Sequence, residues 1–145
     1  MTVFENLQAG AFLERDSNVV MRRLEQVYDF FPKLEERSEQ LAGTMSGGQQ
    51  QMLSMARAYT QNPRVILVDE GSLGLAPIVV DEIFSFLAGV AAAGAALLIV
   101  DQFVARALAL ATSAYVMTRG EIVFAGTSAE LQRSDVFERY LGTHE

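Results

Sequence analysis

A short apolar run that ends in two acidic residues places the strongest constraint on the fold of this chain. Residues 64–70 read RVILVDE, and the run is rich in β-branched side chains. Such a run is typical of a strand that is buried on both faces, as in a parallel sheet covered by helices. The sequence therefore predicts an α/β fold in which Asp69 and Glu70 lie at the carboxyl end of a buried strand.

Strand and helix signals alternate after this run. Residues 96–100 are predicted to form a second buried strand, which closes at Asp101 and Gln102. Pro77 is suited to the first turn of an intervening helix. The apolar face of that helix would consist of Ile78, Val79, Ile83, Phe86 and Leu87. A helix over about 104–111, strands at 114–118 and 121–124 joined by a tight turn, and two short helices from Thr127 onward complete the expected order.

Residues 1–62 contain no strand signal and are predicted to be helical. Thr2 and Glu5 form a capping-box pattern that opens a first helix to about Phe12, and residues 20–28 give an amphipathic second helix. A short third helix is expected between residues 33 and 40. We therefore divide the chain into a helical segment, 1–62, and an α/β half with C-terminal helices, 63–145. No linker separates the two.

The most specific motif lies in residues 41–58, LAGTMSGGQQQMLSMARA. Ser46 is suited to N-cap a helix, and Gln49 stands where a capping box requires Glu or Gln. Gly47 and Gly48 have no Cβ, so a ligand can approach the backbone closely. The free amides and the dipole of a helix N-terminus favour an anion. The segment therefore predicts a phosphate-binding helix start; its alternative is a Gly-rich loop that caps an ordinary helix.

The composition excludes several classes of function. The 145 residues are 50% hydrophobic and 20% charged, as in a globular domain with its own core. The formal net charge is −7 and Lys33 is the only lysine, so we expect no nucleic-acid partner. The absence of cysteine excludes a disulfide framework. No signal peptide is indicated, and the longest apolar run, residues 90–100, is too short to span a bilayer.

The 41–58 motif resembles the signature of ABC ATPases, LSGGQ followed by QQ and ARA, with Met45 in place of Leu. Residues 2–7, TVFENL, are similar to the string that follows the Q-loop in that family. The resemblance covers almost all of this chain, but only the C-terminal part of the family's P-loop NTPase domain. It implies a helical segment followed by a mostly parallel sheet with flanking helices.

The resemblance also implies roles for individual residues. Asp69 and Glu70 match Walker B and the catalytic glutamate, so Asp69 would hold Mg²⁺ and Glu70 would orient the water that attacks ATP. Gln102 takes the position of the switch histidine. Ser46, Gly47, Gly48 and Gln49 would contact the ATP bound by a second subunit. The alternatives are an acidic strand end for the first pair and a polar residue that closes a strand for Gln102.

The substrate class is implied by the loop after Glu70. Residues 72–77, SLGLAP, and Gln102 resemble the ATP-binding subunits of importers for branched-chain amino acids and similar amides. Gly71 departs from the family, which usually has proline there. We therefore expect a peripheral subunit on the cytoplasmic face of the inner membrane. It would pair with a second ATP-binding subunit and with membrane permease subunits.

The chain has no P-loop, because the GxxxxGK[ST] pattern is absent and Lys33 follows a proline. We therefore expect the chain alone to bind ATP weakly or not at all and to be inactive. We also expect an exposed apolar face and self-association, with strand or helix exchange between two copies. Two other functions remain open. One is a non-catalytic module that completes a partner's ATP site; the other is a soluble, non-transport ABC ATPase.

Overall fold

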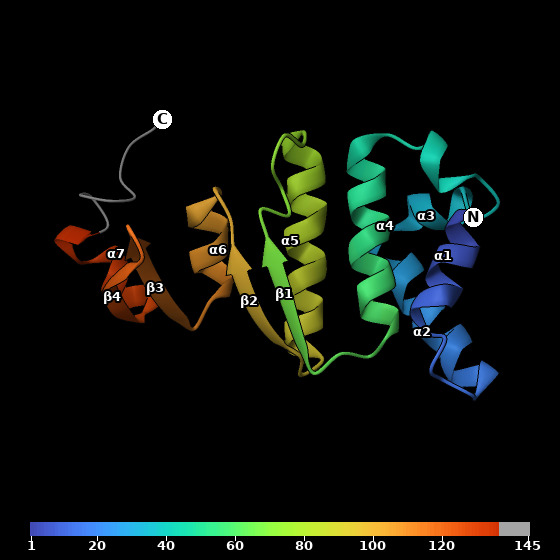
Figure 1. The fold of residues 1–145 in the computed structure, drawn as a ribbon, viewed down its shortest axis with the longest axis horizontal. Coiled ribbons are helices and arrows are strands. Elements are labelled where there is room, and N and C mark those ends of the chain that lie inside the picture. Colours follow the sequence, from blue (N-terminus) through green and yellow to red (C-terminus); the bar gives the residue numbers. More distant parts are fainter. Residues whose placement is uncertain (137–145) are drawn as a thin grey trace. The chain divides into compact units, whose positions relative to one another are not determined.

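The computed structural model describes residues 1–136, which fall into two compact units, Met1–Asp101 and the segment that begins at Gln102 (Figure 1). The chain changes from helices to strands near residue 62, within the first unit. A domain boundary at that residue remains a prediction. Two short helices were expected from Thr127 to the end of the chain, and residues 137–145 of that stretch lie outside the described residues.

The first unit begins with helices, as predicted. They are α1 (Val3–Gly10), α2 (Ser17–Phe30), α3 (Pro32–Glu36), the 3₁₀ turn η1 (Ala42–Thr44) and α4 (Gly47–Thr60). The capping box of Thr2 and Glu5 is present. The only strand-type pairing in residues 1–62 is an isolated bridge between Thr2 and Leu41. α2 begins earlier than the apolar spacing predicted, because the Asp16 side chain accepts a hydrogen bond from the Asn18 amide and caps it.

α1 packs closely against the end of α4. A Cβ on Gly10 would lie 2.1 Å from Thr60 Oγ1 and 2.4 Å from the Arg57 carbonyl, so only glycine permits this approach. Thr60 is fully buried, and its hydroxyl donates to the Leu7 carbonyl at 3.1 Å. The two helices therefore form one packed pair.

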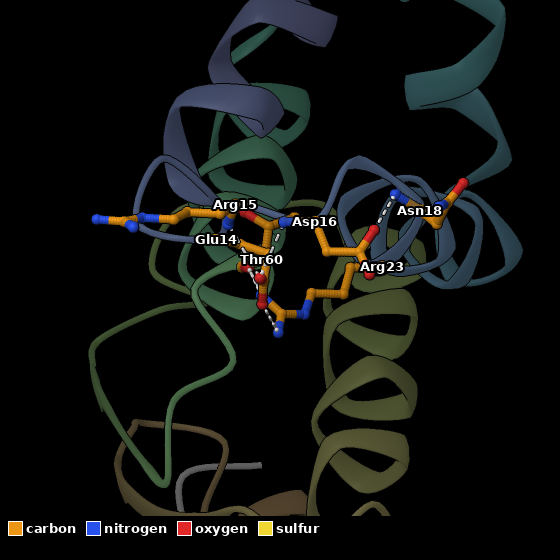
Figure 2. A network of polar contacts seen from close by, with 6 residues as sticks. All are labelled: Glu14, Arg15, Asp16, Asn18, Arg23 and Thr60. Atoms are coloured by element: carbon orange, nitrogen blue, oxygen red, sulfur yellow. Dashed lines mark hydrogen bonds and ion pairs between the residues drawn. The ribbon is translucent and has the colours of Figure 1, made fainter.

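A polar network fastens the α1–α2 loop and α2 to the same end of α4 (Figure 2). The Arg23 guanidinium donates to the Thr60 carbonyl at 3.1 Å and pairs with the Glu14 carboxylate at 3.0 Å. The other oxygen of Glu14 accepts hydrogen bonds from the Arg15 and Asp16 amides. A cation at the carboxyl end of a helix also interacts favourably with the helix dipole.

The α/β part of the first unit has β1 (Val65–Asp69) and β2 (Ala96–Val100), paired in parallel as predicted, with Val65 opposite Ala96. α5 (Pro77–Ala92) connects them and starts at Pro77. Phe86 of α5 contacts the rings of Phe30, Phe31 and Tyr59, and thereby joins α5 to α2 and α4.

The predictions that β1 is buried on both faces and that β2 is a buried strand are wrong for the described residues, because positions of β2 alternate between exposed and half-buried. Val68 is the only buried residue of β1, whereas Leu67 is 72% exposed. Leu67, Leu98 and Val100 lie on the same face of the sheet, and the neighbouring positions of each strand face the helices. Ile78, expected on the inner face of α5, is also exposed at 66%. Helices of the described chain cover one sheet face only.

The second unit contains α6 (Val104–Leu110), the antiparallel strands β3 (Ser113–Thr118) and β4 (Glu121–Thr127), and α7 (Ser128–Gln132). Arg119 and Gly120 both have positive φ, as in a tight hairpin turn. The predicted capping box at α7 is present. Hydrogen bonds from the Thr127 amide and hydroxyl lower the pKa of Glu130. The unit's small core consists of Leu108, Ala114, Val116 and Leu131.

Candidate functional site

The first part of the candidate site is the N-terminus of α4, which forms as the sequence predicted. Ser46 is the N-cap, and its hydroxyl oxygen accepts from the Gln49 amide at 3.4 Å. The Gln49 side-chain oxygen in turn accepts from the Ser46 amide at 3.2 Å. The hydroxyl hydrogen of Ser46 and the side-chain NH₂ group of Gln49 are the donors this capping box does not use.

Two glycine amides at this helix start are open to a ligand. Among the described residues, none accepts a hydrogen bond from the Gly47 or Gly48 amide. A Cβ on Gly47 would meet nothing within 4 Å, whereas a Cβ on Gly48 would lie 3.3 Å from Val79. Gly48 therefore packs against the start of α5, and Gly47 faces open space. Two unpaired amides beside a helix dipole can bind a phosphate.

The second part of the site is the carboxyl end of β1. Asp69 and Glu70 are exposed there, and the Glu70 amide donates to the Val100 carbonyl at 2.7 Å. Glu70 has φ of 48°, a left-handed conformation that costs a residue with a Cβ about 1–2 kcal/mol. The carboxylate-bearing residue is therefore held in an unfavourable backbone conformation by its surroundings.

The loop after Glu70 is packed against α4. Gly71 is buried, and a Cβ there would lie 2.6 Å from the Met55 terminal methyl and 2.7 Å from Val68 Cγ1. A side chain at position 71 would therefore require the Met55 or Val68 side chain to shift. The loop thus contacts α4 at Met55, while Leu75 at its end and Val79 of α5 approach Gly48.

The structure adds two polar residues that sequence reasoning missed. Ser72 is fully buried, its amide donates to Asp101 Oδ2 at 3.3 Å, and its hydroxyl donates to Asp101 Oδ1. The two residues follow the ends of β1 and β2. The two strands are parallel and in register, so the residues that follow them meet at one edge of the sheet. The polar residues directly after the two apolar runs were therefore a signal that the sequence contained.

Gln102 begins the second unit and is exposed, and its carbonyl accepts from the Val104 amide at 2.9 Å. Its predicted contact with a phosphate or a water remains a prediction. Residue 144, the only histidine, lies outside the described residues.

The donor set suits Mg²⁺ only in part. No group of three His, Asp or Glu side chains able to hold a metal ion occurs within residues 1–136. Mg²⁺ is usually held by one or two carboxylates together with waters and substrate phosphates. The exposed carboxylate of Asp69 can supply one such ligand, with the remainder coming from a bound nucleotide.

The described helices include none that is long and apolar enough to cross a bilayer.

Comparison with known proteins decides the family. The family model for the ABC transporter matches residues 1–72. The chain is 43% identical over 143 residues to the high-affinity branched-chain amino acid transport ATP-binding protein BraG of Pseudomonas aeruginosa. It belongs to the ABC transporter ATP-binding family. A probable branched-chain amino acid transport ATP-binding protein LivF of Archaeoglobus fulgidus is 35% identical over 143 residues. The lipopolysaccharide export system ATP-binding protein LptB of Escherichia coli K12 is 30% identical over 145 residues.

Solved structures confirm the ABC ATPase fold. The ADP conformation of MJ1267, an ATP-binding cassette of an ABC transporter, superposes with a TM-score of 0.75 at 29% identity; the match covers 99% of this chain and 63% of that one. The sequence matches cover 98% of this chain and 61% of BraG, and 96% of this chain and 59% of LivF. For LptB they cover 98% of this chain and 60% of that protein. This ABC chain therefore spans about 60% of the length of its relatives.

Proposed function

We propose that the chain is the C-terminal part of the ATP-binding subunit of a bacterial ABC importer for branched-chain amino acids or similar small amides. Two relatives named for branched-chain amino acid transport, at 43% and 35% identity, support the substrate class. The loop SLGLAP and Gln102 support it as well. The subunit would lie at the cytoplasmic face of the inner membrane, bound to permease subunits through its helical segment, residues 1–62.

One observation carries the proposal: the amides of Gly47 and Gly48 have no acceptor among the described residues, at the N-terminus of a capped helix. They would bind the terminal phosphate of ATP held by the P-loop of a second subunit, with the Ser46 hydroxyl as a further donor. Gln49 would keep Ser46 in position through the capping box and add its side-chain amide. The helix dipole favours the same charge.

The acidic end of β1 would act on an ATP held in its own half of the dimer. Bound MgATP supplies a phosphoanhydride whose hydrolysis is strongly favourable. Asp69 would be a ligand of the Mg²⁺, directly or through water. Glu70 would orient the attacking water and accept its proton, and Gln102 would donate a hydrogen bond to a phosphate oxygen or to that water. Gln does not titrate near neutral pH, so it would act only by hydrogen bonding.

A mixing experiment tests the role of the glycine corner. The partner is a P-loop-bearing ABC ATP-binding subunit whose own signature serine is replaced by arginine, so that its P-loops lack a functional signature helix. Adding the present chain is expected to restore ATP hydrolysis. The gain should survive Glu70→Gln in this chain and disappear with Ser46→Arg. Ser54→Arg, at an exposed serine of the same helix, is the matched control and should leave the gain intact. No gain with the wild-type chain would refute the proposal.

The open amides of Gly47 and Gly48 also support a second candidate function, a non-catalytic module that only completes a partner's ATP site. Calorimetry with the isolated chain addresses it, because weak or absent ATP binding is expected when no P-loop lysine is present. Micromolar affinity for ATP would contradict this second candidate.

A further inference from the structure

The end of β2 holds the loop after β1 at two points, one on each side of Gly71. Before Gly71, the Glu70 amide donates to the Val100 carbonyl at 2.7 Å. After it, both the amide and the hydroxyl of Ser72 donate to the Asp101 carboxylate. Val100 and Asp101 are consecutive, so one short stretch of chain fixes both ends of the turn.

The turn between these points needs such support. Glu70 has φ of 48°, in the left-handed region, so an unrestrained chain would leave this conformation readily. Gly71 is buried, and a Cβ there would meet Met55 of α4 and Val68, so the turn lies close against α4 at this point. The turn has its own backbone bonds, from the Leu73 amide to the Glu70 carbonyl and from the Leu75 amide to the Ser72 carbonyl. The bonds to Val100 and Asp101 are those that tie it to the strand side.

The bonds to Asp101 are of a strong kind. Hydrogen bonds to an ionised carboxylate are roughly twice as strong as those between neutral groups. Ser72 is fully buried, so loss of its acceptor would leave a buried hydroxyl and a buried amide unpaired, which is unfavourable away from water.

We propose that Ser72 and Asp101 are positioning residues, and that their hydrogen-bonded pair holds the backbone of Glu70 in its strained conformation at the end of β1. The consequence for ATP hydrolysis rests on the proposed function, in which Glu70 orients water. The positioning itself is a property of the folded chain and needs no nucleotide.

Amide hydrogen exchange on the full 145-residue chain, read by NMR, tests the pair. Asp101→Asn and Ser72→Ala are each expected to speed exchange of the amides of residues 70 and 72 about tenfold or more. Asp101→Asn should also shift the Ser72 amide resonance. Asp101→Glu, which keeps the carboxylate, should recover part of the protection. Matched controls are Asp29→Asn on α2 and Ser85→Ala on α5, at exposed positions of the same unit.

The outcomes separate this proposal from the proposed function. Unchanged exchange at Glu70 in both Asp101→Asn and Ser72→Ala would overturn the pair as a positioning device, whatever the mixing experiment gives. Faster exchange throughout residues 1–101, equal to that at Glu70, would also overturn it, because the pair would then support the unit as a whole. Faster exchange confined to residues 70–75 supports it, even where the mixing experiment fails.

Discussion

At the scale of single residues, the structure gives different reasons for the presence of glycine at the two positions that start α4. Gly48 touches Val79, so its size is limited by packing, whereas nothing in the described chain limits Gly47. A residue that only capped a helix would have no need of an open glycine at its first position. The open space is the feature that a ligand would use.

Gly47→Asp should therefore separate binding from stability. Asp at the first turn of a helix is tolerated, so the free energy of unfolding is expected to change by less than about 0.5 kcal/mol. The added carboxylate would repel a phosphate, so restored ATP hydrolysis in the mixing experiment should fall at least about tenfold. Gly43→Asp, another open glycine outside α4, is the control and should leave hydrolysis unchanged. Equal loss in both variants would contradict a specific role for Gly47.

The Tyr28 hydroxyl is buried and has no hydrogen-bond partner among the described residues. Tyr28→Phe should raise the free energy of unfolding by about 1 kcal/mol, because an unpaired hydroxyl no longer has to be desolvated. Thermal unfolding measures this. Tyr59→Phe removes a hydroxyl that donates to Gln26 at 3.0 Å, so it should be neutral or destabilising. A loss of stability in Tyr28→Phe would contradict the expectation.

Tyr28 also predicts how stability changes at alkaline pH. Burial, with the nearby carboxylates of Glu35 and Glu39, raises the pKa of Tyr28 above 10.0 in the folded chain. The unfolded chain then loses its proton first as the pH rises above about 10, so unfolding is favoured there. Wild-type protein should lose stability above that pH more steeply than Tyr28→Phe in denaturant titrations at stepped pH. Parallel pH profiles for the two proteins would contradict this.

At the scale of elements, the pairing of α1 with α4 depends on Gly10. A Cβ there would lie within 2.4 Å of the Arg57 carbonyl, which is backbone and cannot rotate away. Gly10→Ala should therefore cost about 1–3 kcal/mol despite the better helix propensity of alanine. Chemical denaturation measures the loss, with Gly43→Ala as the control at an open glycine. A stabilised Gly10→Ala variant would show that α1 can move off α4 without cost.

Elements with a local chemical signal could be predicted from the sequence. The capping boxes at Thr2, Ser46 and Thr127 form as expected, because side chain and partner lie three residues apart in the chain. Strand β2 has the predicted bounds, because a glycine before the apolar run and an acidic residue after it mark where the strand begins and ends. The Asp16 cap of α2 was missed because the apolar spacing that marked this helix begins after its first turn.

Features that depend on distant parts of the chain could not be predicted in the same way. The bonds between Ser72 and Asp101 join residues 29 positions apart and follow from the register of two strands. Exposure of Leu67 was not predicted, because an apolar run indicates a strand with two apolar faces but not what covers each face. The candidate site contains one feature of each kind. Its helix cap depends on residues close in the sequence, whereas its acidic strand end is held by contacts with distant residues.

At the scale of the whole molecule, the uncovered face of the β1–β2 sheet is the feature with the largest consequence. Val65, Leu67, Leu98 and Val100 are each more than half exposed, at 57, 72, 55 and 56%. They lie on one face of two paired strands, so their side chains form a continuous apolar surface. Contiguous apolar surface of this kind promotes association, and a two-stranded sheet also offers unpaired strand edges.

We expect the isolated chain to self-associate through this face. Leu67 and Leu98 are direct partners across the two strands, so Leu67→Lys combined with Leu98→Lys would place two like charges at the centre of the surface. The dissociation constant from sedimentation velocity should rise about tenfold or more, since each leucine loses about 1.5–3 kcal/mol of burial. Ile78→Lys, at a residue of α5 that is 66% exposed, is the control for added charge and should change it little. A wild-type chain that sediments as a monomer at all concentrations would contradict the prediction, and equal weakening by Ile78→Lys would show that the sheet face is not the contact.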